Sequence, residues 1–357
     1  MNKRCLYHLM LLALILFLIN AFSFLAIAKK QTIKQGVYKG GFHYELSNKE
    51  ITITEYTGSA KKIKIPDKIK GYKVTIIADS AFHSCSTIRE LILPKYLRYI
   101  SETAFFNCTK LKKVTFPKAP KNIIVIDDYA FAGCAFTELL IPEKIRLCDC
   151  TFINCKKLKN LSFAKGFNGI GGEGIFSGCE SLSTVSVSAS VDHGINGRTF
   201  ENCPHLNKIG IVKSNKTYRI VNGIVFDKKM TSLFFCPIGL NLKTYSVPDS
   251  VTILADNAFC ECKNLESIDL NNTAEIWGSV FFGCTELKSI TIPSTVKSIG
   301  DCAFGNCTSL KTMTIDAEKI IISASAFNKD KDLTLLINTG SEVEEYAKQY
   351  GLKYEYQ

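Results

Sequence analysis

Residues 293–310 of this 357-residue chain read PSTVKSIGDCAFGNCTSL, and similar stretches recur along most of the sequence. The most constant feature is a phenylalanine followed three residues later by a cysteine. The copies are Phe82 and Cys85, Phe105 and Cys108, Phe131 and Cys134, Phe152 and Cys155, Phe176 and Cys179, Phe200 and Cys203, Phe259 and Cys262, Phe281 and Cys284, Phe304 and Cys307, and lastly Phe327 with Asp330 in the cysteine position. Successive phenylalanines follow one another at a nearly constant step, except for one long interval between Phe200 and Phe259. This periodicity predicts an array of one repeated structural unit.

Aliphatic residues recur at fixed positions around each phenylalanine. Around Phe304 and Cys307, for example, Ile299 lies five residues before the phenylalanine, and Leu310, Met313 and Ile315 lie three, six and eight residues after the cysteine. The last two alternate with a polar position, so each repeat is predicted to contain a short strand with one buried face. Proline often follows this strand, and because proline cannot donate to a sheet ladder it marks the strand's end.

The step of about 23 residues lies in the range of leucine-rich repeats, about 20–29 residues. One such unit cannot cover its own apolar face, so successive units must stack, with each phenylalanine over the next. We therefore predict an α/β-type repeat solenoid that is mainly β, with about ten repeats over residues 63–338. Its interior is expected to hold the phenylalanines, the cysteines and the aliphatic residues.

Two segments interrupt this rhythm. The long interval contains two apolar runs, Tyr218–Phe226 and Leu233–Cys236, which predict a hairpin inserted near residues 217–237. The second segment, GIGGEG at residues 169–174, has Gly171 where other repeats have an aliphatic residue. It superficially resembles a phosphate-binding loop but lacks the preceding strand and following helix of such a loop, so we interpret it as a slack turn.

Both ends of the array are predicted to carry caps, because the end faces of a solenoid must be shielded from water. Residues 29–62 form the N-terminal cap, with a hairpin at Phe42–Tyr56. Residues 339–357 form the C-terminal cap, with a short helix at Ser341–Tyr350. In that helix Ser341 is the expected N-cap, with Glu344 three residues later as in a capping box.

Residues 1–28 have the features of a secretory signal peptide. Basic residues come first, an apolar run extends from Leu9 to Ala28, and the run closes with the small-residue pattern Ala26-Ile27-Ala28. We expect cleavage after Ala28 and a secreted or cell-surface protein. An uncleaved membrane anchor stays open as an alternative, because about 20 apolar residues suffice to span a bilayer.

The repeat pattern I-P-x-x-V-x-x-I-G-x-x-A-F-x-x-C-x-x-L-x-x-I-x-I resembles that of the BspA-like leucine-rich-repeat surface proteins. The start of the array, the inserted hairpin and the ending at residues 342–352 are similar as well, so the resemblance extends over roughly residues 36–354. It implies a right-handed solenoid, export to the cell surface, and adhesion to host proteins, matrix or neighbouring microbes. It contributes no catalytic residue.

The repeated cysteines allow two interpretations, a ladder of disulfides or metal ligands and a column of buried thiols. Equivalent side chains in stacked turns point in parallel and not at one another, which favours buried thiols. The pairs Cys148/Cys150 and Cys260/Cys262 lack the spacing of zinc ligands. We expect no metal site, and we expect Cys236 in the inserted hairpin to pack in the interior.

Catalysis and nucleic-acid binding are both disfavoured. The histidines His43, His83, His193 and His205 lie at different repeat positions, and we predict a carboxylate partner for none of them. We therefore expect no catalytic residue and no cofactor. The formal net charge is +11, but the lysines are scattered and form no long basic block.

The exposed side of the strands offers a candidate partner-binding strip. Its members are Lys112, Lys113, Lys159, Lys208, Lys288 and Lys311 immediately before the strands, and Thr115, Ser162, Ser186, Thr291 and Thr314 within them. The strip is either a docking site for an acidic or glycan-rich partner or a sheet face made soluble by lysine. The inserted hairpin near Val221–Cys236 is a second candidate. Protein binding or adhesion is the leading function, and a structural role in the cell envelope and carbohydrate binding are the alternatives.

Overall fold

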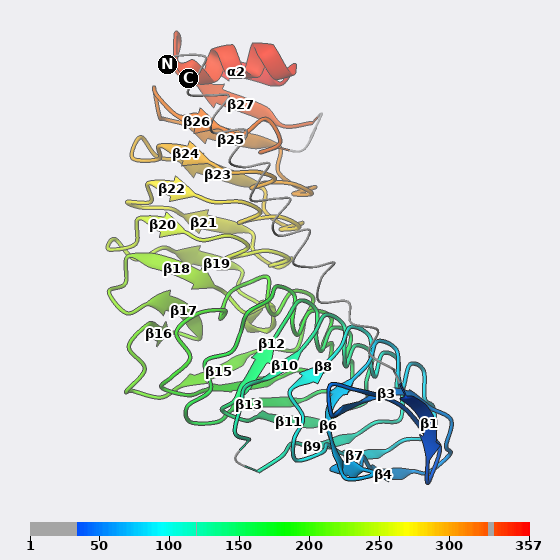
Figure 1. Ribbon diagram of the computed structural model, residues 1–357. Coiled ribbons are helices and arrows are strands. Elements are labelled where there is room, and N and C mark those ends of the chain that lie inside the picture. Colours follow the sequence, from blue (N-terminus) through cyan, green and yellow to red (C-terminus); the bar gives the residue numbers. More distant parts are fainter. Residues whose placement is uncertain (1–33, 119, 328–331) are drawn as a thin grey trace, which may run out of the picture.

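The computed structural model describes residues 34–118, 120–327 and 332–357 (Figure 1). The chain forms a mainly β solenoid of about 13 turns with one short helix at its C-terminal end, which confirms the predicted fold class. The predicted signal peptide, residues 1–28, lies outside the described residues. Within the described part, no helix has the length and apolarity needed to cross a membrane.

The strand that follows each Phe-x-x-Cys turn forms one long side of the solenoid, which we call the ladder face. Its strands pair in parallel within four separate sheets. They are β4 (Lys62–Lys64), β7 (Glu90–Ile92) and β9 (Lys113–Thr115); β11 (Glu138–Ile141), β13 (Asn160–Phe163), β14 (Thr184–Val187) and β15 (Lys208–Ile211); β19 (Thr244–Ser246) and β21 (Ser267–Asp269); and β23 (Ser289–Ile292), β25 (Thr312–Ile315), β27 (Thr334–Ile337) and β28 (Lys353–Tyr356). The pairing register equals one repeat, so that Leu161 lies beside Val185 and Val185 beside Ile209.

A second row of short strands contains the aliphatic residue that precedes each phenylalanine. In the N-terminal half this row is β6 (Tyr72–Ile77), β8 (Tyr99–Ile100), β10 (Ile124–Ile126) and β12 (Ile145–Leu147), with β5 (Lys68–Ile69) antiparallel to β6. In the C-terminal half it is β20 (Ile253–Leu254), β22 (Glu275–Ile276), β24 (Ser298–Ile299) and β26 (Ile321–Ile322). The space between the two rows is filled by the apolar core.

The phenylalanines form a continuous aromatic column through the N-terminal half. Neighbouring rings stack with centroids 4.7 Å apart for Phe82 and Phe105 and 5.9 Å apart for Phe176 and Phe200. Three aromatic residues outside the Phe-x-x-Cys motif extend the stacking. Tyr56 stacks on Phe82, Phe235 stacks on Phe200, and Tyr346 meets Phe327 edge-on. Each of the three precedes a further ladder strand, which explains why the structure has more turns than the ten that the motif predicts.

Each motif cysteine that has a full turn before it is buried against the backbone of that turn. The Sγ of Cys108 donates to the carbonyl of Phe82 at 3.1 Å, and that of Cys155 donates to the carbonyl of Phe131 at 3.3 Å. Burial raises the pKa of Cys155 to about 12, which keeps it a neutral thiol. No disulfide joins any two of the fourteen cysteines in the described part of the chain.

The N-terminal cap is larger than the predicted hairpin. Strands β2 (Phe42–Ser47) and β3 (Glu50–Tyr56) form that hairpin, and β1 (Lys34–Tyr38) adds a third antiparallel strand at its edge. Strand β3 then pairs in parallel with β6 of the first full turn. The cap is therefore continuous with the second row of strands.

The insertion near residues 217–237 has three strands, where two were predicted. They are β16 (Tyr218–Val221), β17 (Ile224–Asp227) and β18 (Ser232–Phe235), and all neighbours pair antiparallel. The apolar run at 218–226 contains a tight turn at Asn222 and Gly223, both with positive φ. Asn-Gly between apolar runs is a strong signal for a hairpin turn. The prediction of one continuous strand over residues 218–226 is therefore wrong.

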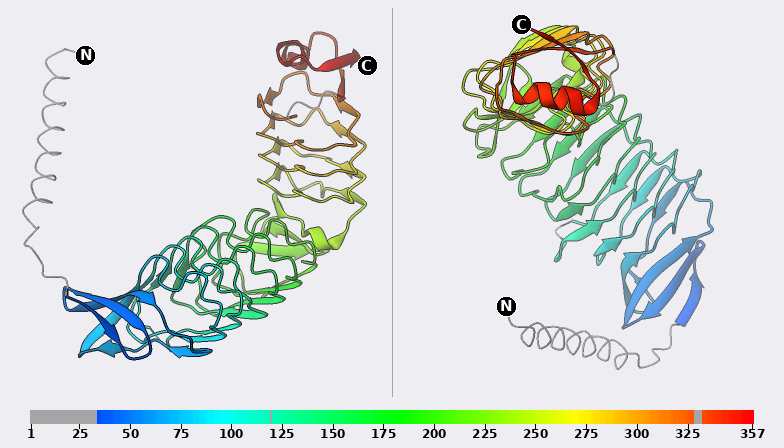
Figure 2. Two further views of the ribbon diagram at one scale, coloured as in Figure 1. Left: turned by 90° about the vertical axis from the view of Figure 1, so that its right-hand side faces the viewer. Right: turned by 90° about the horizontal axis from the view of Figure 1, so that it is seen from above.

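The insertion separates two hydrophobic cores. Because successive strand residues point to opposite faces, Val225 packs in the core of the N-terminal half, whereas Ile224 and Phe226 pack in that of the C-terminal half. A short 3₁₀ helix, Ile238–Leu240, follows β18, and the solenoid axis bends sharply at this point (Figures 1 and 2). The N-terminal half (β4 to β15) and the C-terminal half (β19 to β28) therefore run in different directions.

The helix α2 (Glu342–Tyr350) closes the C-terminal end, and Ser341 and Gly351 flank it as predicted. The capping box does not form. The Ser341 hydroxyl makes no hydrogen bond, and the Glu344 carboxylate accepts from the amide of Gly340 at 3.0 Å. The Glu344 carboxylate also accepts hydrogen bonds from Lys348 and Tyr356. The hydrogen bond from Lys348, followed by those from Gly340 and Tyr356, lowers the pKa of Glu344 to about 2.

The interpretation of residues 169–174 as a slack turn is wrong. A Cβ on Gly169 would lie 1.9 Å from the carbonyl oxygen of Ile145, and one on Gly172 would lie 2.3 Å from the backbone of Cys148. Only glycine permits this close approach of two turns. The missing aliphatic residue is supplied one position early by Ile170, which is buried and bridges to Leu147.

Candidate binding surface

The eleven residues of the predicted strip lie on the ladder face, and their side chains are exposed or half-buried. They are Lys113 and Thr115 in β9, Ser162 in β13, Ser186 in β14, Lys208 in β15, Thr291 in β23, Thr314 in β25, and Lys112, Lys159, Lys288 and Lys311 directly before β9, β13, β23 and β25. Ser162 lies beside Ser186 and Thr291 lies beside Thr314, but the strip as a whole is divided among three sheets. The structure therefore places its members on one face without making them continuous.

The strip is less basic than the lysines alone suggested, because acidic residues occupy the same repeat positions. Lys288 pairs with Glu266 at 3.1 Å, and Lys311 pairs with Asp332 at 3.5 Å. Near the other end, Lys62 pairs with Glu90 at 3.0 Å and lowers the pKa of that carboxyl. Counting the carboxylates at these positions in the sequence could have revealed this pairing.

A groove of about 870 Å³ interrupts the ladder face between β9 and β11. Strand β9 pairs only with β7, and β11 pairs only with β13, so one edge of each strand faces the groove. The groove contains four residues of the predicted strip, namely Lys112, Lys113, Thr115 and Ser162. It is more than twice as large as the hollow of about 380 Å³ between β21 and β23 on the same face.

The groove arises from two turns of unusual length. Apart from the interval that holds the insertion, the step from Phe105 to Phe131 is the longest in the array, and the next step, from Phe131 to Phe152, is the shortest. In the sheet from β11 to β15, Ala164 directly follows β13, and its backbone amide donates to the carbonyl of Ile141 in β11 at 2.9 Å. Pro142 occupies the corresponding position after β11, and because it has no N–H it cannot make that bond toward β9.

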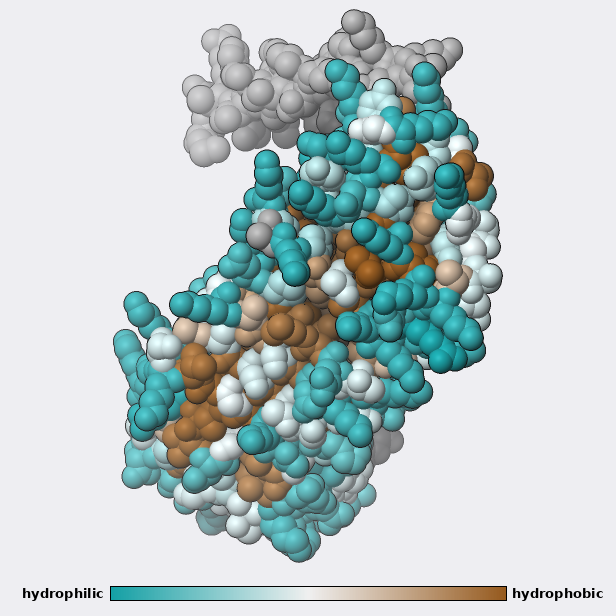
Figure 3. Space-filling view, turned by 90° about the horizontal axis from the view of Figure 1, so that it is seen from below, coloured by the Kyte–Doolittle hydropathy of each residue, from teal (hydrophilic) through white to brown (hydrophobic). Residues whose placement is uncertain are grey.

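The floor and rim of the groove combine apolar and charged side chains. Leu140 is 60% exposed, and Val114 and Phe116 are half-buried beside it. Figure 3 shows the molecule from below, which is the side toward which β4 to β15 lie in Figure 1. An apolar band crosses this face, and hydrophilic side chains flank the band. On the β9 side the rim carries exposed lysines, Lys112, Lys113 and Lys118, and on the β11 side it carries Glu138 and Glu143.

The inserted hairpin, the second predicted candidate, is mainly an interior element. Ile224, Val225, Phe226 and Leu233 are completely buried, and Cys236 is 1% exposed. The backbone amide of Cys236 donates to the carbonyl of Ala258, so it joins the hairpin to the next turn. Strands β17 and β18 therefore act as a joint between the two cores.

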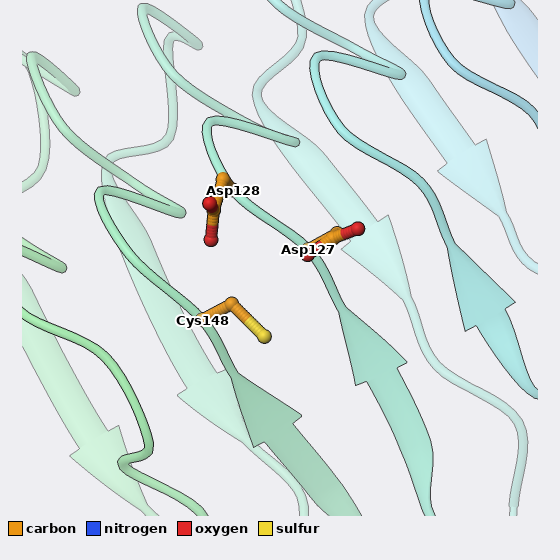
Figure 4. A group of neighbouring side chains, drawn as sticks. All are labelled: Asp127, Asp128 and Cys148. Atoms are coloured by element: carbon orange, nitrogen blue, oxygen red, sulfur yellow. The ribbon is translucent and has the colours of Figure 1, made fainter. Parts of the chain in front are cut away.

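One group of side chains has the composition of a metal site. Asp127 and Asp128 follow β10, Cys148 follows β12 on the adjacent turn, and one potential ligand atom of each lies within 4.8 Å of the others (Figure 4). Asp127 already accepts from the hydroxyl of Tyr99 at 2.5 Å, and Asp128 accepts from the amide of Asp149 at 2.9 Å. Burial and the two carboxylates raise the pKa of Cys148. These contacts explain the cluster as part of the turn.

Two histidines have carboxylate partners that the sequence analysis did not predict. His193 lies 2.5 Å from the adjacent Asp192, and His43 lies 3.9 Å from Glu55 across the β2–β3 hairpin. His193 and Asp192 are both more than half exposed, and the second oxygen of Asp192 accepts from Asn168. Neither histidine contacts a serine, threonine or cysteine in the manner of a catalytic triad within the described chain; His43 meets only the hydroxyl of Thr57, at 3.2 Å.

The sequence matches the model of the BspA type leucine-rich-repeat region over residues 47–124, 124–240 and 228–349. The chain belongs to this family. This confirms the resemblance seen in the repeat, and the matched residues of this BspA-type protein include the groove and the inserted hairpin. No curated protein matches the sequence.

Several solved structures resemble this BspA-type protein in fold. The pneumococcal vaccine antigen PcpA is 18% identical, with a TM-score of 0.64 over 91% of this chain and 98% of its own. A leucine-rich cell surface protein from Faecalibacterium prausnitzii is 23% identical, with a TM-score of 0.56 over 88% and 97%. A leucine-rich-repeat protein from Eubacterium ventriosum is 20% identical, with a TM-score of 0.52 over 86% and 80%. At these identities the likeness concerns the solenoid fold alone.

Proposed function

We propose that this protein is a secreted or cell-surface adhesion protein that binds an extended segment of a protein partner in the groove between β9 and β11. The groove carries the proposal, because it is a larger opening in the ladder face than the hollow at the break between β21 and β23. Export is supported by the signal-peptide features of residues 1–28 and by membership of a family of leucine-rich-repeat surface proteins.

The open strand edges favour an extended partner. An unpaired edge presents a row of backbone N–H and C=O groups to which another strand can add. Two such edges, one on β9 and one on β11, face the same groove. A strand placed between them would complete the ladder that is regular from β11 to β15.

The side chains of the groove define the chemistry of that segment. Leu140 and Phe116 offer apolar contact to alternate residues of a bound strand, which all point to one face. Lys112, Lys113 and Lys118 favour acidic residues on the β9 side. The expected segment is therefore extended, with apolar residues alternating with acidic ones.

The proposed role is non-enzymatic. The large hollows of the ladder face are lined by strand residues and by the turns that flank them. Repeat solenoids offer long surfaces for protein recognition, which agrees with a binding role.

The test is a binding screen of the chain from residue 29 onward against immobilised extracellular-matrix proteins and whole microbial cells. Any partner found is then compared with the variant Leu140→Glu, which places a charge in the apolar floor. We expect its affinity to fall about tenfold or more, as for a buried apolar anchor of an interface. The control is Ile321→Glu, which changes a side chain that is 77% exposed in the C-terminal half.

A second variant, Lys112→Glu with Lys113→Glu, should weaken capture more at low salt than at high salt, because exposed charges are screened by ions. Equal loss of binding in Leu140→Glu and Ile321→Glu would place the site elsewhere. Failure of the unmodified chain to capture any protein or cell would instead favour a structural role in the envelope.

A further inference from the structure

A compact group of lysines surrounds the ring of Tyr96, which lies in the turn before β8 of the second row of strands. The Nζ atoms of Lys73, Lys95 and Lys68 lie 5.1, 5.7 and 5.9 Å from the ring centroid. All three distances are within the range of a cation–π interaction, about 6 Å. Lys95 directly precedes Tyr96 in the sequence, whereas Lys68 and Lys73 come from the preceding turn and reach the same ring through the stacking of turns.

Opposing carboxylates do not balance this charge. Lys68 and Lys73 lie directly opposite each other in the β5–β6 pair, an arrangement that normally destabilises a hairpin. Within the described residues, none of the three lysines has a carboxylate within 4 Å. The side chain of Asp67 accepts from the backbone amide of Lys95 at 2.7 Å.

The pocket beside the ring is small, about 210 Å³. Lys73, Lys95 and Tyr96 line it together with Lys121 from the next turn. Its one acidic residue is Glu50, whose carboxylate is engaged by the guanidinium of Arg98 and the hydroxyl of Thr75. Pockets for drug-sized ligands are usually about 300–1,000 Å³, so this one suits a single anionic group of a larger ligand.

A second hollow of about 620 Å³ continues along the following turns and shares Lys121. It adds Lys144 and Arg146, and the amide of Asn168 lies at its edge. Strands β6, β8, β10 and β12 are neighbours in order, so the two hollows follow one another along the solenoid (Figure 1). A linear ligand with several anionic groups can therefore contact both.

We propose that the pocket at Tyr96 and the adjoining hollow bind a sulfated polysaccharide. Sulfate groups match the ammonium and guanidinium groups, and the amides of Asn122 and Asn168 can hydrogen-bond sugar hydroxyls. A single-stranded nucleic acid is a poorer match. Its bases need free aromatic faces to stack on, whereas the ring of Tyr96 is surrounded by lysines.

Tyr96 acts in this site as a positioning residue. The negative face of its ring attracts the ammonium groups and partly offsets their mutual repulsion. The site has no lining residue in common with the groove between β9 and β11 except Glu143 at the far end of the second hollow. This inference therefore stands independently of the proposed protein binding.

The probe is heparin, with the unsulfated backbone polysaccharide, polyphosphate and single-stranded DNA measured in parallel on the full chain. At physiological salt, Lys73→Gln with Lys95→Gln should lower heparin affinity about tenfold, since two charge-assisted contacts are lost. Tyr96→Leu should lower it several-fold, whereas Tyr96→Phe, which keeps the ring, should bind as the parent does. The control is Lys297→Gln with Lys319→Gln, the same change of charge at exposed lysines of the C-terminal half.

A second readout does not depend on the variants' folding. Heparin should protect Lys73, Lys95 and Lys121 of the unmodified chain from acetylation, and should leave Lys297 and Lys319 reactive. Equal loss of affinity in the control pair, or no protection at Lys73 and Lys95, would overturn the site. Binding of polyphosphate or DNA as tight as that of heparin would overturn the assignment to a sulfated sugar.

Discussion

The two halves of the solenoid use the same repeat but differ in regularity. In the C-terminal half the motif phenylalanines from Phe259 to Phe327 are almost evenly spaced, and strip lysines such as Lys288 are paired with acidic residues. In the N-terminal half the spacing is uneven, with a long turn directly followed by a short one around Phe131. That half contains the open groove, the exposed Leu140 and the lysines around Tyr96.

This comparison separates stability from recognition. In the regular half, the break between β21 and β23 leaves a hollow of about 380 Å³, less than half the volume of the groove between β9 and β11. A turn of a different length breaks the register of the ladder, and the break exposes strand edges and apolar side chains together. We therefore look for binding where the repeat is irregular.

The largest expected effect comes from removing a ring of the aromatic column. Phe131→Ala and Phe304→Ala should each lower the free energy of unfolding by about 3–5 kcal/mol, because both rings are almost completely buried. The single tryptophan, Trp277, lies in the C-terminal half, so its fluorescence reports that half, whereas circular dichroism reports both. In urea unfolding, Phe304→Ala should shift the fluorescence transition strongly, and Phe131→Ala should shift mainly the circular dichroism transition. If both variants shift both signals equally, the two cores unfold as one unit.

A smaller effect tests the inserted hairpin as the boundary between the halves. Val225→Ala and Ile224→Val remove buried methyl groups from adjacent residues and should each cost about 1–2 kcal/mol. Val225 packs in the N-terminal core and Ile224 in the C-terminal core. Only Ile224→Val should therefore shift the Trp277 transition. A larger fluorescence shift for Val225→Ala would contradict the assignment of the two faces.

The smallest expected effect concerns pH and the C-terminal cap. Hydrogen bonds lower the pKa of Glu344 to about 2, below its ordinary value of 4.5. Its contribution to stability is therefore complete above about pH 4.5 and is lost as the pH falls toward 2. Protection of the α2 amides from hydrogen exchange should decrease between pH 5 and pH 2.5. This decrease should be absent in Glu344→Gln and present in the control Glu345→Gln; the same decrease in all three proteins would exclude Glu344 as its source.

Much of the fold follows from the sequence alone, because a repeat states the same local rule many times. The Phe-x-x-Cys spacing determined the stacked turns, the strand alternation and the thiol column, since so short a unit can bury its apolar side chains only against copies of itself. The errors arose where the rule is broken. The turn at Asn222 and Gly223, the close contact at Gly169 and the aromatic residues Tyr56 and Phe235 occur outside the motif.

The candidate binding sites were decided only by the tertiary structure. The sequence determined that Thr115 and Ser162 lie on strands of one face, but not that β9 and β11 fail to pair and leave a groove between them. Likewise, Lys68 and Lys73 join Lys95 at the ring of Tyr96 only because consecutive turns lie side by side. Periodicity predicts which side chains are buried within a turn, whereas a site depends on the distances between turns.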